Sequence, residues 1–175
     1  MRRRSFALGL SGLALASASG TLRAQGVEWE DIVGEGFRVQ MPKGYKILAG
    51  TQTAAGVMHQ YRIAFPSGFG LEFAYTDLKN DSPLDPTTRA DHLRRAMDVL
   101  QQRWPGSTIL AQEDVWLGQA QGRSVVLSIQ KDTGVLITRM YPTLTRLYAQ
   151  IVLARNDEKQ SPVIERFLNS LRLTS

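Results

Sequence analysis

Hydrophobic and polar residues alternate along most of the chain from residue 27 onward, and this period of two is typical of half-buried antiparallel strands. The alternation predicts strands over 27–32, 37–41, 56–65, 70–76, 108–116, 122–130, 135–141 and 146–154. In the fourth of these, Leu71, Phe73 and Tyr75 fall on one side and are expected to face a core. Turn-forming residues separate the runs, so hairpins are expected between several of them.

Two segments show the spacing of three and four residues that marks one face of a helix. In 87–104 the apolar stripe consists of Ala90, Leu93, Met97, Leu100 and Trp104. The polar segment 77–86 predicts a loop, at whose end Asp85 is placed to cap this helix. A second helix begins near Ser161 and carries Val163, Ile164, Phe167, Leu168 and Leu171 on one side. The order of elements predicts an α+β domain, a central antiparallel sheet of about six or seven strands sandwiched by two helices.

The first 24 residues have the layout of an export signal: a basic start, a short apolar run over 6–18, and small residues before Ala24. The run is too short and too rich in glycine, alanine and serine to cross a bilayer as a stable helix. We therefore expect a signal peptide over 1–24, cleaved after Ala24 or alternatively after Ala18, and one domain over 25–175. The expected location is the periplasm or another exported compartment.

The start of this segment is similar to the twin-arginine signal, in which two arginines are followed by one residue and then phenylalanine. Arg3, Arg4 and Phe6 match that pattern, whereas Arg2 and Ala7 depart from it. The resemblance implies export of an already folded protein. General secretion is the alternative, and replacement of Arg3 and Arg4 by lysine would distinguish the two routes.

The charge distribution argues against binding to nucleic acid. The formal net charge is +5, but the first 24 residues hold four arginines and no acidic residue, which leaves 17 basic against 16 acidic residues in the rest. The chain has no cysteine, which excludes a thiol nucleophile, a disulfide framework and an iron–sulfur cluster. No cofactor is predicted.

One candidate binding site comes from two neighbouring predicted strands that each carry arginine and tyrosine on one face. Its residues are Arg139, Tyr141, Arg146 and Tyr148, which a short turn at 142–145 would bring into one patch. Guanidinium groups give such a patch the means to bind a carboxylate, a phosphate or a loop of a partner. The alternative is structural: the side chains cover the sheet, and the arginines pair with acidic residues of the chain itself.

Catalytic chemistry finds little support. His59 lies on a strand and, with a carboxylate, is the one candidate base, while His92 is expected to be solvated on its helix. The two histidines lack metal-ligand spacing, and neither a nucleophile elbow nor a phosphate-binding loop occurs. Glu113 and Asp114 are adjacent on a strand and therefore point to opposite faces. Ser124 and Ser128 share a face that we expect to point outward.

Several short patterns together resemble the PsbP/Mog-type superfamily, which includes DcrB-like exported bacterial proteins. The patterns are Phe37-x-Val39-x-x-Pro42, Leu117-Gly118 with Gly122-Arg123, Arg139-x-Tyr141, Arg146-Leu147-Tyr148, and Phe167-Leu168-x-Ser170-Leu171. The resemblance covers most of 36–173 and implies a central antiparallel sheet between helices. It also implies an accessory or binding role, and it carries no shared catalytic residues.

These observations favour a non-enzymatic periplasmic accessory or binding protein. Its expected partner is another envelope protein, with no nucleic acid and no membrane span in the mature chain, and it is expected to be a monomer or a weak oligomer. The alternative is a small hydrolase-like or ligand-processing enzyme that uses His59 with a carboxylate. A carrier for a small apolar ligand is a third possibility and requires a closed cavity between sheet and helix.

Overall fold

The computed structural model describes residues 26–78, 85–129 and 133–174, and within these ranges the chain forms ten strands and two helices. The residues assigned to the export signal, including Arg3, Arg4, Phe6 and Ala24, lie outside the described ranges. No helix among the described residues is long and apolar enough to cross a membrane.

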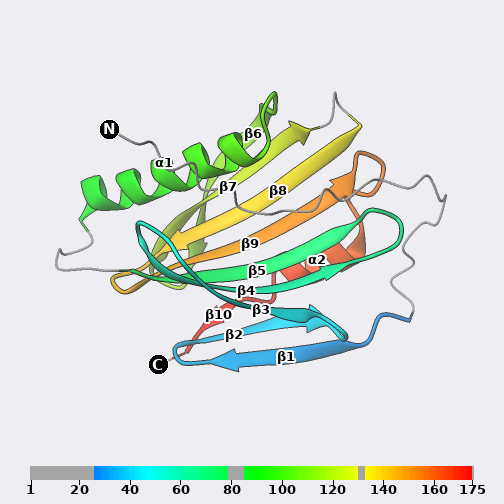
Figure 1. Cartoon of the computed structure of the whole chain (residues 1–175), viewed down its shortest axis with the longest axis horizontal. Coiled ribbons are helices and arrows are strands. Elements are labelled where there is room, and N and C mark those ends of the chain that lie inside the picture. Colours follow the sequence, from blue (N-terminus) through cyan, green and yellow to red (C-terminus); the bar gives the residue numbers. More distant parts are fainter. Residues whose placement is uncertain (1–25, 79–84, 130–132, 175) are drawn as a thin grey trace, which may run out of the picture.

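Seven strands build one large antiparallel sheet in the order β3-β4-β5-β9-β8-β7-β6 (Figure 1). Their bounds are β3 Lys46–Gln52, β4 Gly56–Ala64, β5 Gly70–Leu78, β6 Thr108–Leu117, β7 Ala120–Ile129, β8 Gly134–Pro142 and β9 Arg146–Arg155. Within the described ranges, strands β3 and β6 therefore form the two free edges of this sheet.

A second, smaller sheet covers one face of the large one. It has the order β1-β2-β10, with β1 over Trp29–Gly34, β2 over Phe37–Pro42 and β10 over Arg172–Leu173. Helix α2, over Pro162–Leu168, lies on the same side, and its end is bonded to β2, where the backbone N–H of Gln40 donates to Ser170 Oγ at 3.1 Å. We call the side of the large sheet that these elements cover the small-sheet face.

The opposite side, the helix face, is crossed by α1, over Pro86–Arg103 (Figure 1). The side chain of Asp85 caps this helix by accepting from the backbone N–H of Thr88 at 2.7 Å. Leu93 and Leu100 of the predicted stripe are buried, Met97 and Trp104 are half-buried, and Ala90 is exposed. The predicted α+β class is thus confirmed, with α1 on one face and α2 on the other.

Each face of the large sheet has its own hydrophobic core. On the small-sheet face the fully buried rings are Phe37, Phe69, Phe73 and Phe167. On the helix face Leu93 and Leu100 pack on residues of β7, β8 and β9, among them Leu127 and Leu136. Burial of one such side chain stabilises the fold by about 1.5–3 kcal/mol relative to exposure.

Three expectations about the strands need correction. The sequence pattern did not predict β3 or β10, and residues 77–78, assigned to a loop, belong to β5. The large sheet has seven strands, which confirms the predicted number, and the strands predicted over 27–32 and 37–41 lie in the separate small sheet. Ser124 and Ser128, expected to point outward, are 6% and 4% exposed because β7 is covered on both faces.

Candidate functional site

The four residues of the predicted patch lie in a row on the small-sheet face. Tyr141 and Tyr148 are direct partners in the pairing of β8 with β9, and each is flanked on its own strand by an arginine two positions away. The two tyrosines are only 4% and 3% exposed. The small sheet covers them, so these rings belong to the core of the domain.

Arg139 completes the end of α2. Its Nη1 donates to the backbone oxygen of Leu168 at 3.1 Å and to Asn169 Oδ1 at 3.0 Å. Gln150, the register partner of Arg139 on β9, donates to the backbone oxygen of Phe167 at 2.6 Å. These contacts satisfy carbonyl groups that the last turn of a helix leaves without a partner. The guanidinium of Arg139 is therefore engaged by the chain itself.

Arg146 connects three parts of the fold. Its Nε donates to Asp77 Oδ1 on β5 at 2.6 Å, and its Nη1 donates to the backbone oxygen of Glu35 in the turn between β1 and β2. The guanidinium carbon lies 5.2 Å from the centre of the Tyr75 ring. Hydrogen bonding to Asp77 raises the pKa of Arg146 above its usual value, so the side chain stays charged. Arg146 thus ties the small sheet to the large one.

His59 reaches the same carboxylate from β4. Its Nε2 lies 3.2 Å from Asp77 Oδ2, and its ring stacks on that of Tyr75 with 4.6 Å between the ring centres. The side chains of His59 and Asp77 are 36% and 43% exposed, whereas that of Arg146 is 17% exposed. Two groups that the sequence placed in separate hypotheses, His59 and Arg146, therefore share one acid.

Strand register explains why these groups meet. His59 pairs with Tyr75, which in turn pairs with Tyr148, while the next row joins Asp77 to Arg146. Because side chains two positions apart share a face, all five lie on the small-sheet face. Chemically, the arrangement offers a histidine beside a carboxylate that an arginine already holds. No group of three or more acidic, histidine or cysteine side chains among the described residues is placed to hold a metal ion.

A second polar cluster lies on the helix face and was not foreseen. Glu72 on β5 accepts from Gln60 at 2.8 Å and from two nitrogens of Arg62 at 2.8 and 2.6 Å. Arg103, the last residue of α1, lies 3.6 Å from the same carboxylate. The Glu72 side chain is 8% exposed, so this cluster anchors the end of α1 to the sheet.

His92 also differs from expectation. It is half-buried, and its Nε2 is buried without a hydrogen-bond partner among the described residues. Arg89, one turn earlier on α1, donates to Gln121 on β7 at 3.3 Å, so this part of the helix faces the sheet. The sequence stripe could not show this, because it counted only apolar positions.

The edge strand β6 is the most exposed part of the large sheet. All its residues except Val115 and Leu117 are exposed. Three large apolar side chains are among them, with exposed fractions of 47% for Ile109, 58% for Leu110 and 65% for Trp116. On the helix face of this strand, Asp114 Oδ1 lies 3.6 Å from Arg123 Nη2, and Asp114 Oδ2 accepts a hydrogen bond from Gln121 Nε2 at 3.4 Å. Apolar side chains on a free sheet edge mark a candidate interaction surface.

Comparison with known proteins supports the fold but not a sequence family. No family model matches the chain, and no curated protein matches it in sequence. The solution structure of the cyanobacterial PsbP protein CyanoP from Synechocystis sp. PCC 6803 is similar over 90% of this chain and 98% of that chain, with a TM-score of 0.62 and 12% identity. The chain has a PsbP-like fold. The predicted resemblance is thus confirmed for the fold alone.

Two other solved structures show weaker similarity. LpqN, involved in cell envelope biogenesis of Mycobacterium tuberculosis, matches with a TM-score of 0.45 and 13% identity over 86% of this chain and 92% of that chain. PA94, a protein of unknown function from Pseudomonas aeruginosa, matches with a TM-score of 0.42 and 10% identity over 74% and 85% of the two chains. Neither similarity is high enough to support an argument about function.

Proposed function

We propose that this chain is an exported accessory protein that binds another protein of the cell envelope, and that the exposed edge of β6 is its binding surface. The observation that carries the proposal is the exposure of Ile109, Leu110 and Trp116 along a strand that, in the described part of the chain, has a neighbour on only one side. A free edge with apolar side chains is a hazard for aggregation unless a partner uses it. Tryptophan is also among the residues most enriched at protein interfaces.

In this proposal the predicted Arg/Tyr patch stabilises the fold and does not contact the partner. Arg139 is bonded to the end of α2, and Arg146 is bonded to Asp77 and to the turn between the first two strands. Tyr141 and Tyr148 are buried. The two arginines and two tyrosines of the patch are thus bonded or packed within the domain. The apolar side chains of β6, in contrast, are exposed.

Export is the second part of the proposal and rests on the leader. The basic start, the short apolar run and the small residues before Ala24 support removal of 1–24 on the way out of the cytoplasm. Fractionation of an expressing bacterium tests this directly. A shortened chain in the periplasmic fraction is expected, and full-length chain confined to the cytoplasm would contradict it.

Site-specific photo-crosslinking in intact cells tests the binding surface. A benzophenone side chain at position 116 or 109 is expected to give a discrete adduct with one envelope protein. Val99 of α1 is the matched control, because it is also large, apolar and 62% exposed but lies on a helix. Equal adducts from position 99, or none from either β6 position, would refute the proposed surface.

A small hydrolase-like enzyme is the second candidate, because the 3.2 Å contact between His59 and Asp77 provides a base beside an acid. Hydrolysis of nitrophenyl acetate and nitrophenyl phosphate by the purified chain, beside a His59→Gln variant, tests it. We expect no difference between the two proteins, because Asp77 is also held by Arg146. Turnover that disappears in the variant would favour the enzyme.

A further inference from the structure

We infer that the partner binds through an extended segment that lies beside β6 as an eighth strand, with a basic side chain opposite Glu113 and an apolar side chain against Trp116, three positions away. This inference rests on the proposed function and specifies the chemistry of the partner.

The backbone of β6 selects an extended segment. Among the described residues β6 pairs with β7 alone, so the N–H and C=O groups on its outer side have no strand partner there. Such an edge binds a peptide by continuing the hydrogen-bonding pattern of the sheet, while side chains on alternate faces provide the specificity. The length of β6, from Thr108 to Leu117, is sufficient for such pairing.

The charges on β6 select a basic residue. Glu113 is exposed, and within the described ranges no cation lies within ion-pair distance of it. Its neighbour Asp114 differs, because Arg123 and Gln121 already contact that carboxylate. A lysine or arginine opposite Glu113 would therefore meet an acid that no described cation neutralises, and opposite charges stabilise a cross-strand pair.

Register fixes the spacing of the two contacts. Glu113 lies opposite Ser124 on the small-sheet face, whereas Trp116 lies opposite Gln121 on the helix face. An odd separation along a strand always puts two side chains on opposite faces. The partner segment must therefore present its basic and apolar side chains three positions apart and on opposite sides, which is a readable sequence signature.

The same charges argue against a second copy of this chain as the occupant. Antiparallel pairing of two β6 strands about their centres would bring Glu113 and Asp114 of each copy close to those of the other. Like charges in facing positions destabilise strand pairing. The edge is therefore better suited to a basic segment of a different protein than to self-association.

Two synthetic probes test the inference. Both are nine-residue peptides of alternating threonine and valine with leucine three positions on either side of the centre, and they differ only in a central lysine or glutamate. We expect the lysine peptide to shift the amide NMR signals of β6 in the purified chain and to bind about fivefold more tightly than the glutamate peptide. Glu113→Lys should reverse this preference.

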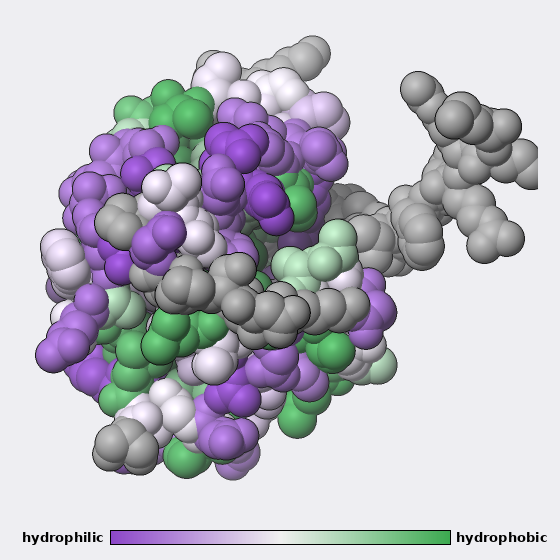
Figure 2. Space-filling model, turned by 90° about the vertical axis from the view of Figure 1, so that its left-hand side faces the viewer, coloured by the Kyte–Doolittle hydropathy of each residue, from purple (hydrophilic) through white to green (hydrophobic). Residues whose placement is uncertain are grey.

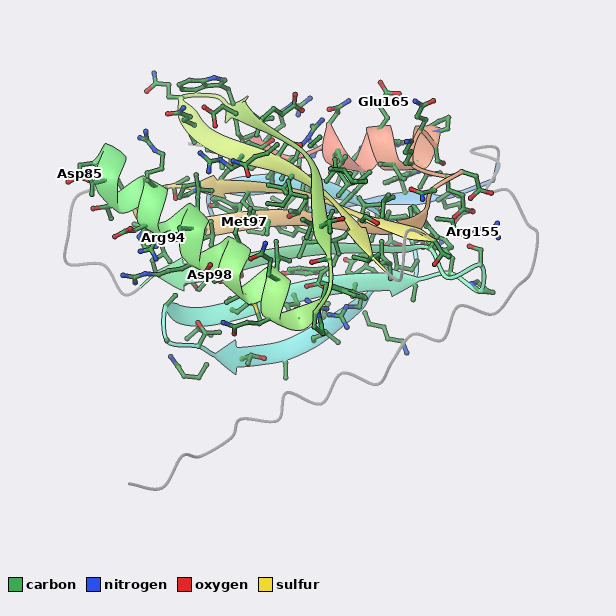
Figure 3. All side chains as sticks on the ribbon, turned by 90° about the horizontal axis from the view of Figure 1, so that it is seen from above. Asp85, Arg94, Met97, Asp98, Arg155 and Glu165 are labelled. Atoms are coloured by element: carbon green, nitrogen blue, oxygen red, sulfur yellow. The ribbon has the colours of Figure 1, made fainter. Side chains whose placement is uncertain are left out.

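The control is Asp98→Lys, an equal change of charge on the exposed face of α1 (Figure 3). It should leave the preference for the lysine peptide unchanged. No shift of β6 signals at millimolar peptide, or a preference that Glu113→Lys does not alter, would overturn the inference. If position 116 still crosslinks to one protein, the proposed function stands without it.

Analytical ultracentrifugation of the purified chain tests whether a second copy binds the β6 edge. The inference predicts a monomer at micromolar concentration. A dimer that Trp116→Asp dissociates would assign the β6 edge to a second copy and would overturn the inference.

Discussion

Replacement of Arg146 by methionine should destabilise the domain, because this arginine ties the two sheets together. Methionine retains most of the apolar stem and removes only the guanidinium. The variant loses the 2.6 Å bond to Asp77 and the bond to the backbone oxygen of Glu35. The ion pair with the Glu35 carboxylate contributes little, since that side chain is 93% exposed.

The magnitude follows from these contacts. A hydrogen bond to a charged group contributes about 1.5 kcal/mol. The Asp77 side chain is 43% exposed, so solvent reduces the contribution of the Arg146–Asp77 bond to roughly 0.5–1 kcal/mol, while the bond to the Glu35 backbone oxygen keeps the full value. The sum is about 2 kcal/mol, which for a domain of this size corresponds to a fall in Tm of roughly 4–8 °C.

Urea and thermal unfolding followed by circular dichroism measure this loss. The control is Arg94→Met on α1, where the guanidinium is 64% exposed and is bonded to the exposed Asp91, and no resolvable change is expected there. If Arg146→Met were as stable as the control, the guanidinium would not be a structural tie. The reasoning that assigns Arg146 to the scaffold would then fail.

Three further changes probe other parts of the structure. Gly56→Ala should lower the free energy of unfolding by more than about 2 kcal/mol, because the new Cβ would lie 1.8 Å from the backbone oxygen of Asp77. Gly44→Ala meets only open space and should lower it by about 1 kcal/mol; urea unfolding measures both. Burial raises the pKa of Tyr141, so the unfolded chain loses this proton first and stability should fall above about pH 10, less so in Tyr141→Phe. The backbone hydrogen bond from Thr88 lowers the pKa of Asp85 in the folded chain. The Asp85 cap should therefore stabilise α1 fully above the pKa of the unfolded chain and lose this effect as pH falls through the pKa of the folded chain, which amide exchange of the first turn measures.

The sequence predicted the elements whose burial differs between their two sides. The strand at 70–76 and the helix at 87–104 both have an apolar side and were located to within a few residues. The largely exposed strand β6 was also predicted, over 108–116. Strand β3 was not predicted, because Ile47, Leu48 and Ala49 follow one another and Lys46–Gln52 shows no alternation of apolar and polar residues.

The site could be predicted only in part, because register is a property of the folded sheet. The sequence named Arg146 and His59 but placed Asp77 in a loop, since a polar run of this kind is typical of turns. Only the pairing of β4, β5 and β9 brings the three together. Glu72 was missed for a similar reason: its partners Arg62 and Arg103 come from another strand and from α1.

The sequence also did not indicate β6 as a binding surface. Hydrophobic residues appear in several places on the mixed surface of Figure 2, so apolar character alone does not identify an interface. The 65% exposure of Trp116 follows from the place of β6 at the end of the strand order. Edge position cannot be read from local pattern.

Hydrogen exchange on the complex with the protein crosslinked from position 116 tests the central claim most directly. Strand β3, the other free edge of the large sheet, is an internal control in the same sample. The account predicts that the outer amides of β6 exchange at least tenfold more slowly in the complex than in the free chain, while those of β3 are unchanged. Slower exchange at β3, with β6 unaffected, would contradict it.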